Sequence, residues 1–506
     1  MDVSVQKEED VEQSDSVLFG PDETEPRKIA CDRDGIPLPG TRLLEKMPYV
    51  PFAFLGLGIY RAWIELVFVG SFVQFPFVVF AGHDAFDVVM IAVMFACAAA
   101  AHRIGPFFRH RSVYWLAGLS LTVSTICAFL SIFFPAWAAQ LALPATVLGG
   151  FGIAITILLW SELYSCLNPY RVGLYYSASI VMAALILYLC RGLSTPWLFA
   201  MGLVLPAASL VCCSLGYIAL PKRELPHSAS ARFSFPWKPT LLMAIYAFAY
   251  GLRESSQYAS SFGPHSAFGT LAVGAVVFAL IYARRRSFDF SIIYRIALPL
   301  MVGAFLVLPA FGTLSDSVSN FCAMAGYTAF SILIMLILAN MSYRYGISAI
   351  WLFGIERGVR ALFSLFGRQL VDFISIEAPD FDVTLVIGSL TILLVVAGSM
   401  ILFSEKELSS RWGVSFRGSS EEADGRASVK RHSLADRCHD LAVRYELSQR
   451  EEEVLLQLAQ RKTVSTIERE LFIAKDTAKT HIRHIYRKMD IHSRDELFDV
   501  LGVGGK

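Results

Sequence analysis

Long apolar runs alternate with short polar segments over most of this chain. A membrane-spanning helix needs about 20 predominantly apolar residues, and charged residues, Pro and Gly separate twelve runs of roughly that length. The runs lie near residues 50–70, 86–103, 113–133, 139–163, 170–190, 196–219, 240–260, 266–283, 292–312, 318–342, 347–373 and 382–403. The pattern predicts a block of twelve membrane-spanning helices within residues 47–403.

The polar segments between the runs predict how the block is oriented. Alternate loops, counted from a cytoplasmic N-terminus, contain thirteen Lys and Arg residues, whereas the opposite loops contain only Arg191. Cytoplasmic loops are enriched in Lys and Arg. We therefore expect a multi-pass protein of a bacterial inner (cytoplasmic) membrane, surrounded by the lipid bilayer, with both termini in the cytoplasm.

The longest internal loop, residues 221–239, follows the sixth run and divides the block into halves of about 47–220 and 238–403. The halves repeat each other weakly, because Gly58 precedes an arginine in the first run and Gly251 precedes one in the seventh. This layout resembles the major facilitator superfamily. The resemblance implies two six-helix halves that face each other around a central cavity.

Composition excludes a single soluble domain. Residues 50–403 contain 32 charged residues in 354 positions, whereas the other 152 positions contain 55. We expect residues 1–46 to form a disordered, acidic cytoplasmic tail and residues 404–443 to form a linker, in which a short helix begins near residue 432. Seven of the nine cysteines lie in apolar stretches and no CxxC pair occurs, so neither a disulfide framework nor a metal site is predicted.

A set of ionisable side chains lies within the apolar runs, where each costs several kcal/mol unless it is paired or hydrated. The set comprises the pairs Arg61–Glu65, Glu356–Arg360 and Arg368–Asp372, each four residues apart, together with Arg253, Glu254 and Arg357. Residues four apart share a helix face, so each pair can neutralise itself. Two hypotheses remain open: structural ion pairs that hold the halves together, or a polar cavity that binds a small anionic ligand through Arg61, Arg253 and Arg360.

The pattern changes at residue 444, where apolar residues recur at the spacing of short amphipathic helices. Ser448 and Glu451 form a capping box at the start of the first helix, and Ser493 and Glu496 form another at the start of the fourth. Ser465 is predicted to open the second helix, and the third is predicted over about 475–488. The residues expected to face the core are Val454, Leu455, Leu458, Ile482, Ile485, Leu497 and Leu501.

The third of these helices carries the candidate chemistry. Lys475, Lys479, Arg483 and Arg487 recur every fourth residue and so form one basic stripe. A solvated helix face is the ordinary explanation of such a stripe. Here it follows a short capped helix and a tight turn, as in a helix-turn-helix whose second helix enters the major groove of double-stranded DNA. Residues 444–506 contain 12 basic and 11 acidic residues, so the charge of this region is segregated rather than large.

The segments LSQREEEVLLQLAQ, TIERELFIAKDTAKTHIRHIYRKM and HSRDEL closely resemble the LuxR-type (GerE-like) DNA-binding domain over roughly 447–501. By that resemblance Lys479, Thr480 and Arg483 would face bases, and Thr477, Arg487 and Lys488 would contact phosphates. The full set of DNA-binding candidates is Lys475, Thr477, Lys479, Thr480, His481, Arg483, Arg487 and Lys488. Ala474 stands where the family usually has a Ser that caps the recognition helix.

These observations predict an all-α chain in which a twelve-helix membrane domain precedes a four-helix LuxR-type domain over residues 444–506. The expected function is a membrane-bound one-component transcriptional regulator that binds promoter DNA, as a homodimer in the manner of the family, with the membrane domain as sensor or anchor. The alternative is a transporter with an attached regulatory domain. No phosphate loop, nucleophile elbow or metal-ligand cluster is present, so we predict neither an enzyme nor a cofactor.

Overall fold

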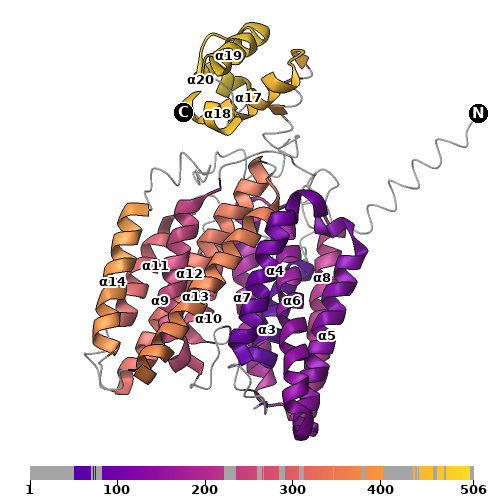
Figure 1. Cartoon of the computed structure of the whole chain (residues 1–506), viewed down its shortest axis with the longest axis vertical. Helices are drawn as coiled ribbons and strands as arrows, with labels where there is room; N and C mark the ends of the chain where they lie inside the picture. The colour runs from indigo at the N-terminus through magenta and orange to yellow at the C-terminus, as the bar shows by residue number, and fades with distance from the viewer. Residues whose placement is uncertain are drawn as a thin grey trace, which may run out of the picture.

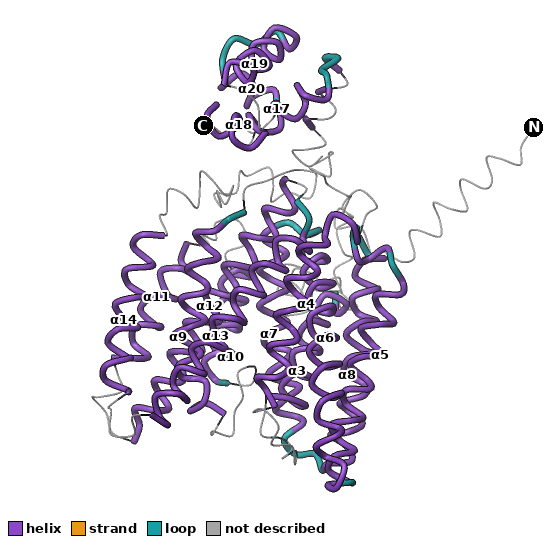
Figure 2. Tube along the Cα trace, viewed as in Figure 1, coloured by secondary structure: helices purple, strands orange, loops and turns teal. Residues whose placement is uncertain are grey.

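The computed structural model describes most of the membrane block and of the C-terminal domain. The described residues are 51–69, 72, 75, 82–220, 235–258, 265, 267–283, 291–306, 313–345, 347–377, 383–402, 437–438, 441–442, 444–459, 464–471 and 475–501. Every regular element among them is helical, as Figure 2 shows. The all-α prediction is therefore confirmed. The predicted tail at 1–46 lies outside these residues, as does most of the predicted linker.

The first run forms a nine-residue α-helix inside its predicted bounds, and the next five runs each form a helix close to theirs (Figure 1). The helices are α3 (Gly56–Ile64), α4 (Gly82–Ile104), α5 (Arg111–Phe133), α6 (Ala138–Tyr164), α7 (Pro169–Cys190) and α8 (Thr195–Ile218). The short α3 continues as a π-helical turn over Glu65–Val69. Gly105, with φ of +66°, directly follows α4, where a left-handed residue commonly ends a helix.

The last six runs form a second set in the same order. The helices are α9 (Trp237–Tyr258), α10 (Phe268–Ala283), α11 (Ser291–Leu306), α12 (Thr313–Tyr345), α13 (Ala349–Glu377) and α14 (Val383–Leu402). Within the first half, α3 packs against α7 and α8, and α5 packs against α6. The equivalent pairs of the second half are α9 with α13 and α14, and α11 with α12. The predicted two-half arrangement is present.

The halves meet through two equivalent helix pairs, α4 with α13 and α10 with α7. Close packing within each half also repeats. A Cβ atom on Gly58 of α3 would lie 2.1 Å from the carbonyl oxygen of Ser179 in α7, and one on Gly251 of α9 would lie 2.2 Å from that of Ser364 in α13. Small residues let the backbones of membrane helices approach closely. The two glycines therefore have the same packing role in the two halves.

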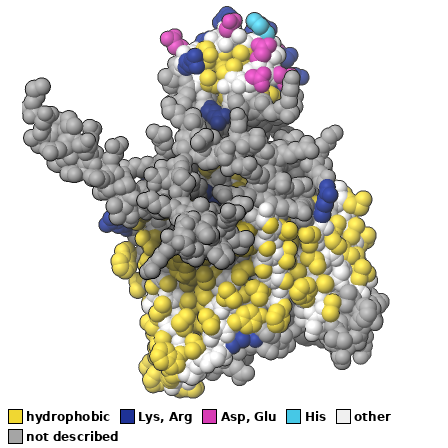
Figure 3. All heavy atoms as spheres, turned by 180° about the vertical axis from the view of Figure 1, so that it is seen from behind, with side chains coloured by type: hydrophobic (Ala, Val, Ile, Leu, Met, Phe, Trp, Pro, Cys, Tyr) yellow, Lys and Arg dark blue, Asp and Glu magenta, His cyan; other side chains and the backbone are white. Residues whose placement is uncertain are grey.

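The outer surface of the block is apolar, and a broad hydrophobic face with Lys and Arg near its margins is visible in Figure 3. Among the described residues, six helices are long and apolar enough to cross a membrane, and three shorter helices are also apolar. Exposed tryptophans lie near the ends of the helices: Trp115 (78% exposed) and Trp237 (60%) on the predicted cytoplasmic side, and Trp137 and Trp197 (both 66%) on the other. Tryptophan is enriched at both membrane interfaces, so the chain is a multi-pass membrane protein.

The C-terminal domain contains α17 (Gln449–Ala459), α18 (Val464–Leu471), α19 (Lys475–Met489) and α20 (Arg494–Val500). They enclose a core of their own, in which Leu455, Ile467, Ile485 and Leu497 are fully buried. The predicted core residues are buried in this domain, except that Ile482 is only partly covered. The predicted second helix begins one residue early, at Val464, so that Ser465 lies inside it.

Candidate nucleic-acid interface and buried charge clusters

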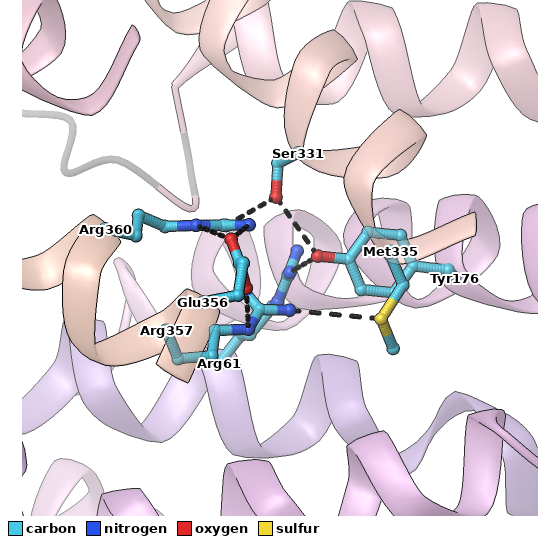
Figure 4. Close-up of polar contacts among 7 residues, drawn as sticks. All are labelled: Arg61, Tyr176, Ser331, Met335, Glu356, Arg357 and Arg360. Carbon is cyan, nitrogen blue, oxygen red and sulfur yellow. Dashed lines mark hydrogen bonds and ion pairs between the residues drawn. The ribbon is translucent and has the colours of Figure 1, made fainter. Parts of the chain in front are cut away.

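Several charged side chains of the described membrane block gather in two clusters. The first lies where α3, α7, α12 and α13 come together (Figure 4). Arg360 donates from Nε to Oε1 of Glu356 at 2.8 Å and from Nη1 to Oγ of Ser331 at 2.8 Å. Ser331 also lies 3.3 Å from the hydroxyl of Tyr176, and that hydroxyl accepts a hydrogen bond from Arg61. The chain Arg61–Tyr176–Ser331–Arg360 thus connects the two halves.

Two further side chains complete this central cluster. Arg357 lies with Nε 3.5 Å from Oε2 of Glu356 and with Nη2 4.0 Å from the sulfur of Met335. The guanidinium of Arg61 lies over the ring of Tyr176, 4.7 Å from its centroid, in the geometry of a cation–π contact. The predicted pairing of Glu356 with Arg360 is present.

The second cluster surrounds Arg368, whose side chain is 5% exposed. Its Nε donates to Oδ1 of Asp84 at 2.6 Å, and its Nη2 donates to Oδ2 of Asp87 at 2.7 Å. Its Nη1 donates to Oε2 of Glu254 at 2.5 Å. One buried guanidinium on α13 therefore holds carboxylates from α4 and α9. The sequence suggested Asp372 as the partner of Arg368, but Asp372 is exposed. Asp84 and Asp87 could not be predicted as partners, because each is more than 280 residues from Arg368 in the sequence.

The remaining predicted membrane residues have separate partners. Arg253 donates to Oδ1 of Asn320 at 3.0 Å, and its place in an anion-binding cavity with Arg61 and Arg360 stays a prediction. Glu65, fully buried, accepts from the backbone N–H of His265 at 2.6 Å. Glu162, to which the sequence assigned no role, is 2% exposed and accepts from the backbone N–H groups of Phe107 and Phe108.

In the C-terminal domain, α19 has one buried and one exposed face. Ala478, Ile485 and Met489 are buried, while Ile482 and Tyr486 are partly covered. All the predicted DNA-binding residues are exposed except His481, which is half-buried; the exposed ones are Lys475, Thr477, Lys479, Thr480, Arg483, Arg487 and Lys488. A groove of about 610 Å³ beside α19 is lined by cationic and apolar side chains of this helix, together with Val464 of α18 and residues 490–492 after α19.

A buried carboxylate, Glu451, connects α17 to α19. Its Oε2 accepts from the backbone N–H of Ser448 at 2.7 Å, and Ser448 Oγ accepts from the N–H of Glu451 at 3.3 Å, which confirms the predicted capping box. Lys488 Nζ donates to the same carboxylate at 2.8 Å and to the carbonyl of Glu446 at 2.8 Å. Burial raises the pKa of Glu451, but the hydrogen bonds from Lys488 and Ser448 outweigh it and bring the pKa to about 2.

These contacts place the Lys488 ammonium between the turn before α17 and the end of α19. The turn itself is defined by Glu446, whose φ is +50°, and by the hydrogen bond from Leu447 N to Ala442 O at 2.8 Å. The helix α19 ends in the same way, with Asp490 at φ +54° and a bond from the N–H of residue 491 to the carbonyl of residue 486. Both ends match the Schellman pattern.

The domain extends toward the membrane block beyond α17. Residues 437–438, 441–442 and 444 are helical, in agreement with the short helix predicted from residue 432. Cys438 and Ala442 are buried, and Arg437 donates to the carbonyl of Leu501 at 2.7 Å. At α20, Ser493 accepts from the N–H of Glu496 at 3.1 Å as predicted, although the Glu496 carboxylate bonds the N–H of His492 rather than that of Ser493. Ala474 lies outside the described residues.

Residues 445–501 match the model of a family described as bacterial regulatory proteins, luxR family. This C-terminal domain is a LuxR-type helix-turn-helix domain. The LuxR-type resemblance identified in the sequence is confirmed, and α19 is the helix that the sequence predicts to be its recognition helix. No curated protein matches the chain.

Three solved structures are similar to the membrane block. The human organic anion transporter MFSD10 (TETRAN) has a TM-score of 0.49 and 16% identity over 69% of this chain and 98% of its own. The major facilitator superfamily transporter FucP, in its outward conformation, has a TM-score of 0.45 and 13% identity, over 70% of this chain and 99% of its own. The proton:xylose symporter XylE has a TM-score of 0.47 and 13% identity, over 69% of this chain and 94% of its own.

Proposed function

We propose that this chain is a membrane-bound one-component transcriptional regulator. The membrane block anchors the chain in the bacterial inner membrane and senses a signal, and the LuxR-type domain binds promoter DNA from the cytoplasmic side. The observation that carries the proposal is the exposed cationic face of α19, on a LuxR-type domain that shares its chain with a multi-pass membrane block.

The division of α19 into two faces supports specific roles for its side chains. Guanidinium and ammonium groups bind phosphates, and arginine also binds guanine edges in the major groove. Lys479, Thr480 and Arg483 are the residues that we assign to the bases. Thr477 and Arg487 are assigned to phosphates, together with the flanking Lys475 and His481. Lys488 is assigned a phosphate as well, although its ammonium already bonds Glu451 and Glu446.

Binding as a homodimer on paired half-sites follows from the way helix-turn-helix domains read DNA. Residues 403–436 join the two modules, and a Ser- and Gly-rich linker transmits orientation poorly. Dimerisation of the membrane blocks, which raises the effective concentration of the second domain, is therefore the more plausible coupling. The measurement is the mass of the chain in nanodiscs with and without a bound duplex. A monomer on DNA at saturation would refute the dimer.

The test of the DNA-binding function uses the full chain in nanodiscs and genomic fragments from its source organism. We expect the wild-type chain to enrich a small set of fragments, and Arg483→Ala to lose this selection because a base contact is worth about 1–3 kcal/mol. Arg444→Ala is the matched control, since Arg444 is exposed but lies outside α19. Equal enrichment by the wild type and by Arg483→Ala would refute the assigned surface, and no enrichment by the wild type would refute the function.

A further inference from the structure

The segment that joins α4 to α5, residues 102–111, is short, basic and exposed, and we call it the basic loop. It contains no acidic residue, and five of its side chains are basic and exposed: His102, Arg103, Arg109, His110 and Arg111. Within the described part of the chain, no carboxylate forms an ion pair with its arginines. A guanidinium stays protonated at any physiological pH. The basic loop therefore presents three permanent positive charges at the surface of the block.

A buried carboxylate fixes the backbone of the basic loop. Glu162, near the end of α6, accepts from the N–H of Phe107 at 3.2 Å and from the N–H of Phe108 at 2.9 Å. The hydroxyl of Tyr217 donates to the same carboxylate at 3.3 Å, and its ring stacks on that of Phe108 with centroids 5.1 Å apart. Glu162 offsets one of the three positive charges from behind. The loop keeps an excess of positive charge in a fixed arrangement, which lowers the cost of ordering it on binding.

The chain enters the membrane block next to the basic loop. The 3₁₀ turn Phe52–Leu55 packs against α7 and α8, and the carbonyl of Phe54 accepts from the hydroxyl of Tyr164 at 2.8 Å. Tyr164 ends α6, two residues after Glu162, and Tyr217 lies in the last turn of α8. The entering chain and the basic loop therefore lie on the ends of the same two helices.

The sequence ahead of residue 51 carries the complementary charge. Residues 1–26, which we call the acidic segment, contain nine acidic residues and one lysine, whereas residues 27–50 contain five basic and three acidic residues. A coil of 24 residues spans roughly 25–30 Å, so the connection is long enough to reach the loop. A tether of this kind gives an effective concentration of about 1 mM. Weak ion pairs are sufficient for binding at that concentration.

We propose that the acidic segment docks on the basic loop, at the predicted cytoplasmic end of the membrane block. Its carboxylates pair with the guanidinium groups of Arg103, Arg109 and Arg111. The exposed cations of α19 are a second cationic surface of the chain, but residues 403–436 separate them from the block. The shorter connection favours the basic loop, and docking there holds the acidic segment away from α19. Docking depends on the membrane block alone and holds whether or not the chain binds DNA.

Photo-cross-linking from the basic loop tests the docking. The variant Ser112→p-benzoylphenylalanine places the cross-linker at an exposed position directly after Arg111, and every basic residue of the loop remains. The full chain is irradiated in nanodiscs of phosphatidylcholine, and cross-linked peptides are identified by mass spectrometry. We expect cross-links to residues 1–26 of the same chain at about 0.15 M salt and their loss at about 1 M, because the Debye length falls from about 8 Å to about 3 Å.

Removal of charge from the basic loop is expected to lower the yield of cross-links at least about fivefold, because three exposed ion pairs are lost. This loop variant combines Arg103→Gln, Arg109→Gln and Arg111→Gln. A matched control removes the same charge from the segment between α10 and α11 and is expected to keep the yield; it combines Arg284→Gln, Arg285→Gln and Arg286→Gln. If the loop variant does not fold, the charge is removed from the acidic segment instead, by Glu8→Gln, Glu9→Gln and Asp10→Asn, and a lower yield is again expected.

Anionic lipid headgroups and DNA phosphates are the two competing occupants of the basic loop. Nanodiscs that contain phosphatidylglycerol supply the first, and an added duplex of arbitrary sequence supplies the second. Cross-links to residues 1–26 that persist in the presence of both support the docking. Cross-links that move to the lipid or to the duplex, no cross-link to residues 1–26, or equal yields with and without the three loop substitutions overturn it. An equal loss of yield in the matched control overturns the assignment to this loop.

Discussion

Arginine is used in opposite ways in the two modules of this chain. On α13, Arg360 and Arg368 point into a protein core and bond side chains of other helices. On α19, Arg483 and Arg487 point away from the core and remain exposed. In both places the arginines are spaced by multiples of four residues and so share one helix face. What differs is the helix face that packs: on α13 the arginine-bearing face packs inside the helix bundle, whereas on α19 the opposite face packs in the core of the small domain.

This difference shows that the function of a helix cannot be predicted from the spacing of its charged residues alone. A buried arginine must be matched by partners, so its removal affects stability first. An exposed arginine in a basic stripe contributes little to the stability of the fold, so its removal affects DNA binding first. The comparison therefore predicts that substitutions on α13 lower the stability of the block, whereas substitutions on the exposed face of α19 leave the fold intact.

The largest expected effect is that of Arg368→Ala. It leaves three buried carboxylates without their shared cation, and removing one partner of a buried ion pair costs about 3–5 kcal/mol. The measurement is the unfolding midpoint of the full chain in detergent. Arg103→Ala is the exposed control and is expected to change little. A midpoint that stays at the wild-type value would show that the second cluster does not hold the halves together.

The glycine contacts test whether the two halves are built alike. Gly58→Ala and Gly251→Ala each place a Cβ within about 2 Å of a backbone oxygen, and overpacking of this kind costs about 1–3 kcal/mol. Gly192→Ala is the control, because nothing lies within 4 Å of its Cβ. We expect similar losses of thermal stability in both variants. A loss confined to one of them would refute the equivalence of the halves.

Glu451 provides the corresponding stability test in the C-terminal domain. Its folded pKa of about 2 lies below the value of about 4.3 for an unperturbed glutamate. The stability from its ionised form is therefore present above pH 4.3 and is lost as the pH falls toward 2. We expect Glu451→Gln to destabilise a fragment that begins at residue 432 by about 1–2 kcal/mol at neutral pH, and to flatten this pH dependence.

Urea unfolding followed by tyrosine fluorescence measures the effect of Glu451→Gln. The control is Glu453→Gln, whose side chain is 40% exposed and pairs with Arg450 on the surface. Equal pH profiles for the two variants would show that the contact between Glu451 and Lys488 does not stabilise the domain.

Much of the fold was predictable because it depends on local pattern. The apolar runs predicted the helices α4 to α14 to within a few residues, and Ser448 and Glu451 predicted the start of α17. The polar partners inside the block were not predictable in this way. Asp84 and Asp87 lie at the start of α4, yet they bond Arg368 on α13, and only the packing of the halves brings them together.

The recognition helix was predictable in identity because its family pattern is local, but the contacts of Lys488 were not. Its ammonium lies against a carbonyl and a carboxylate at the start of α17, 42 and 37 residues earlier in the chain. The basic side chains predicted from the sequence therefore have different surroundings, since Lys488 bonds the start of α17 whereas Arg483 and Arg487 are exposed.

The salt dependence of DNA binding tests the central claim most directly, and it needs no knowledge of the operator. The full chain in nanodiscs is titrated with a duplex of arbitrary sequence at several salt concentrations. The logarithm of the affinity falls with the logarithm of salt by about 0.9 for each phosphate contact. We expect Lys475→Ala combined with Arg487→Ala to reduce this slope by about 1 to 2. A slope equal to that of the wild type would contradict DNA binding by α19.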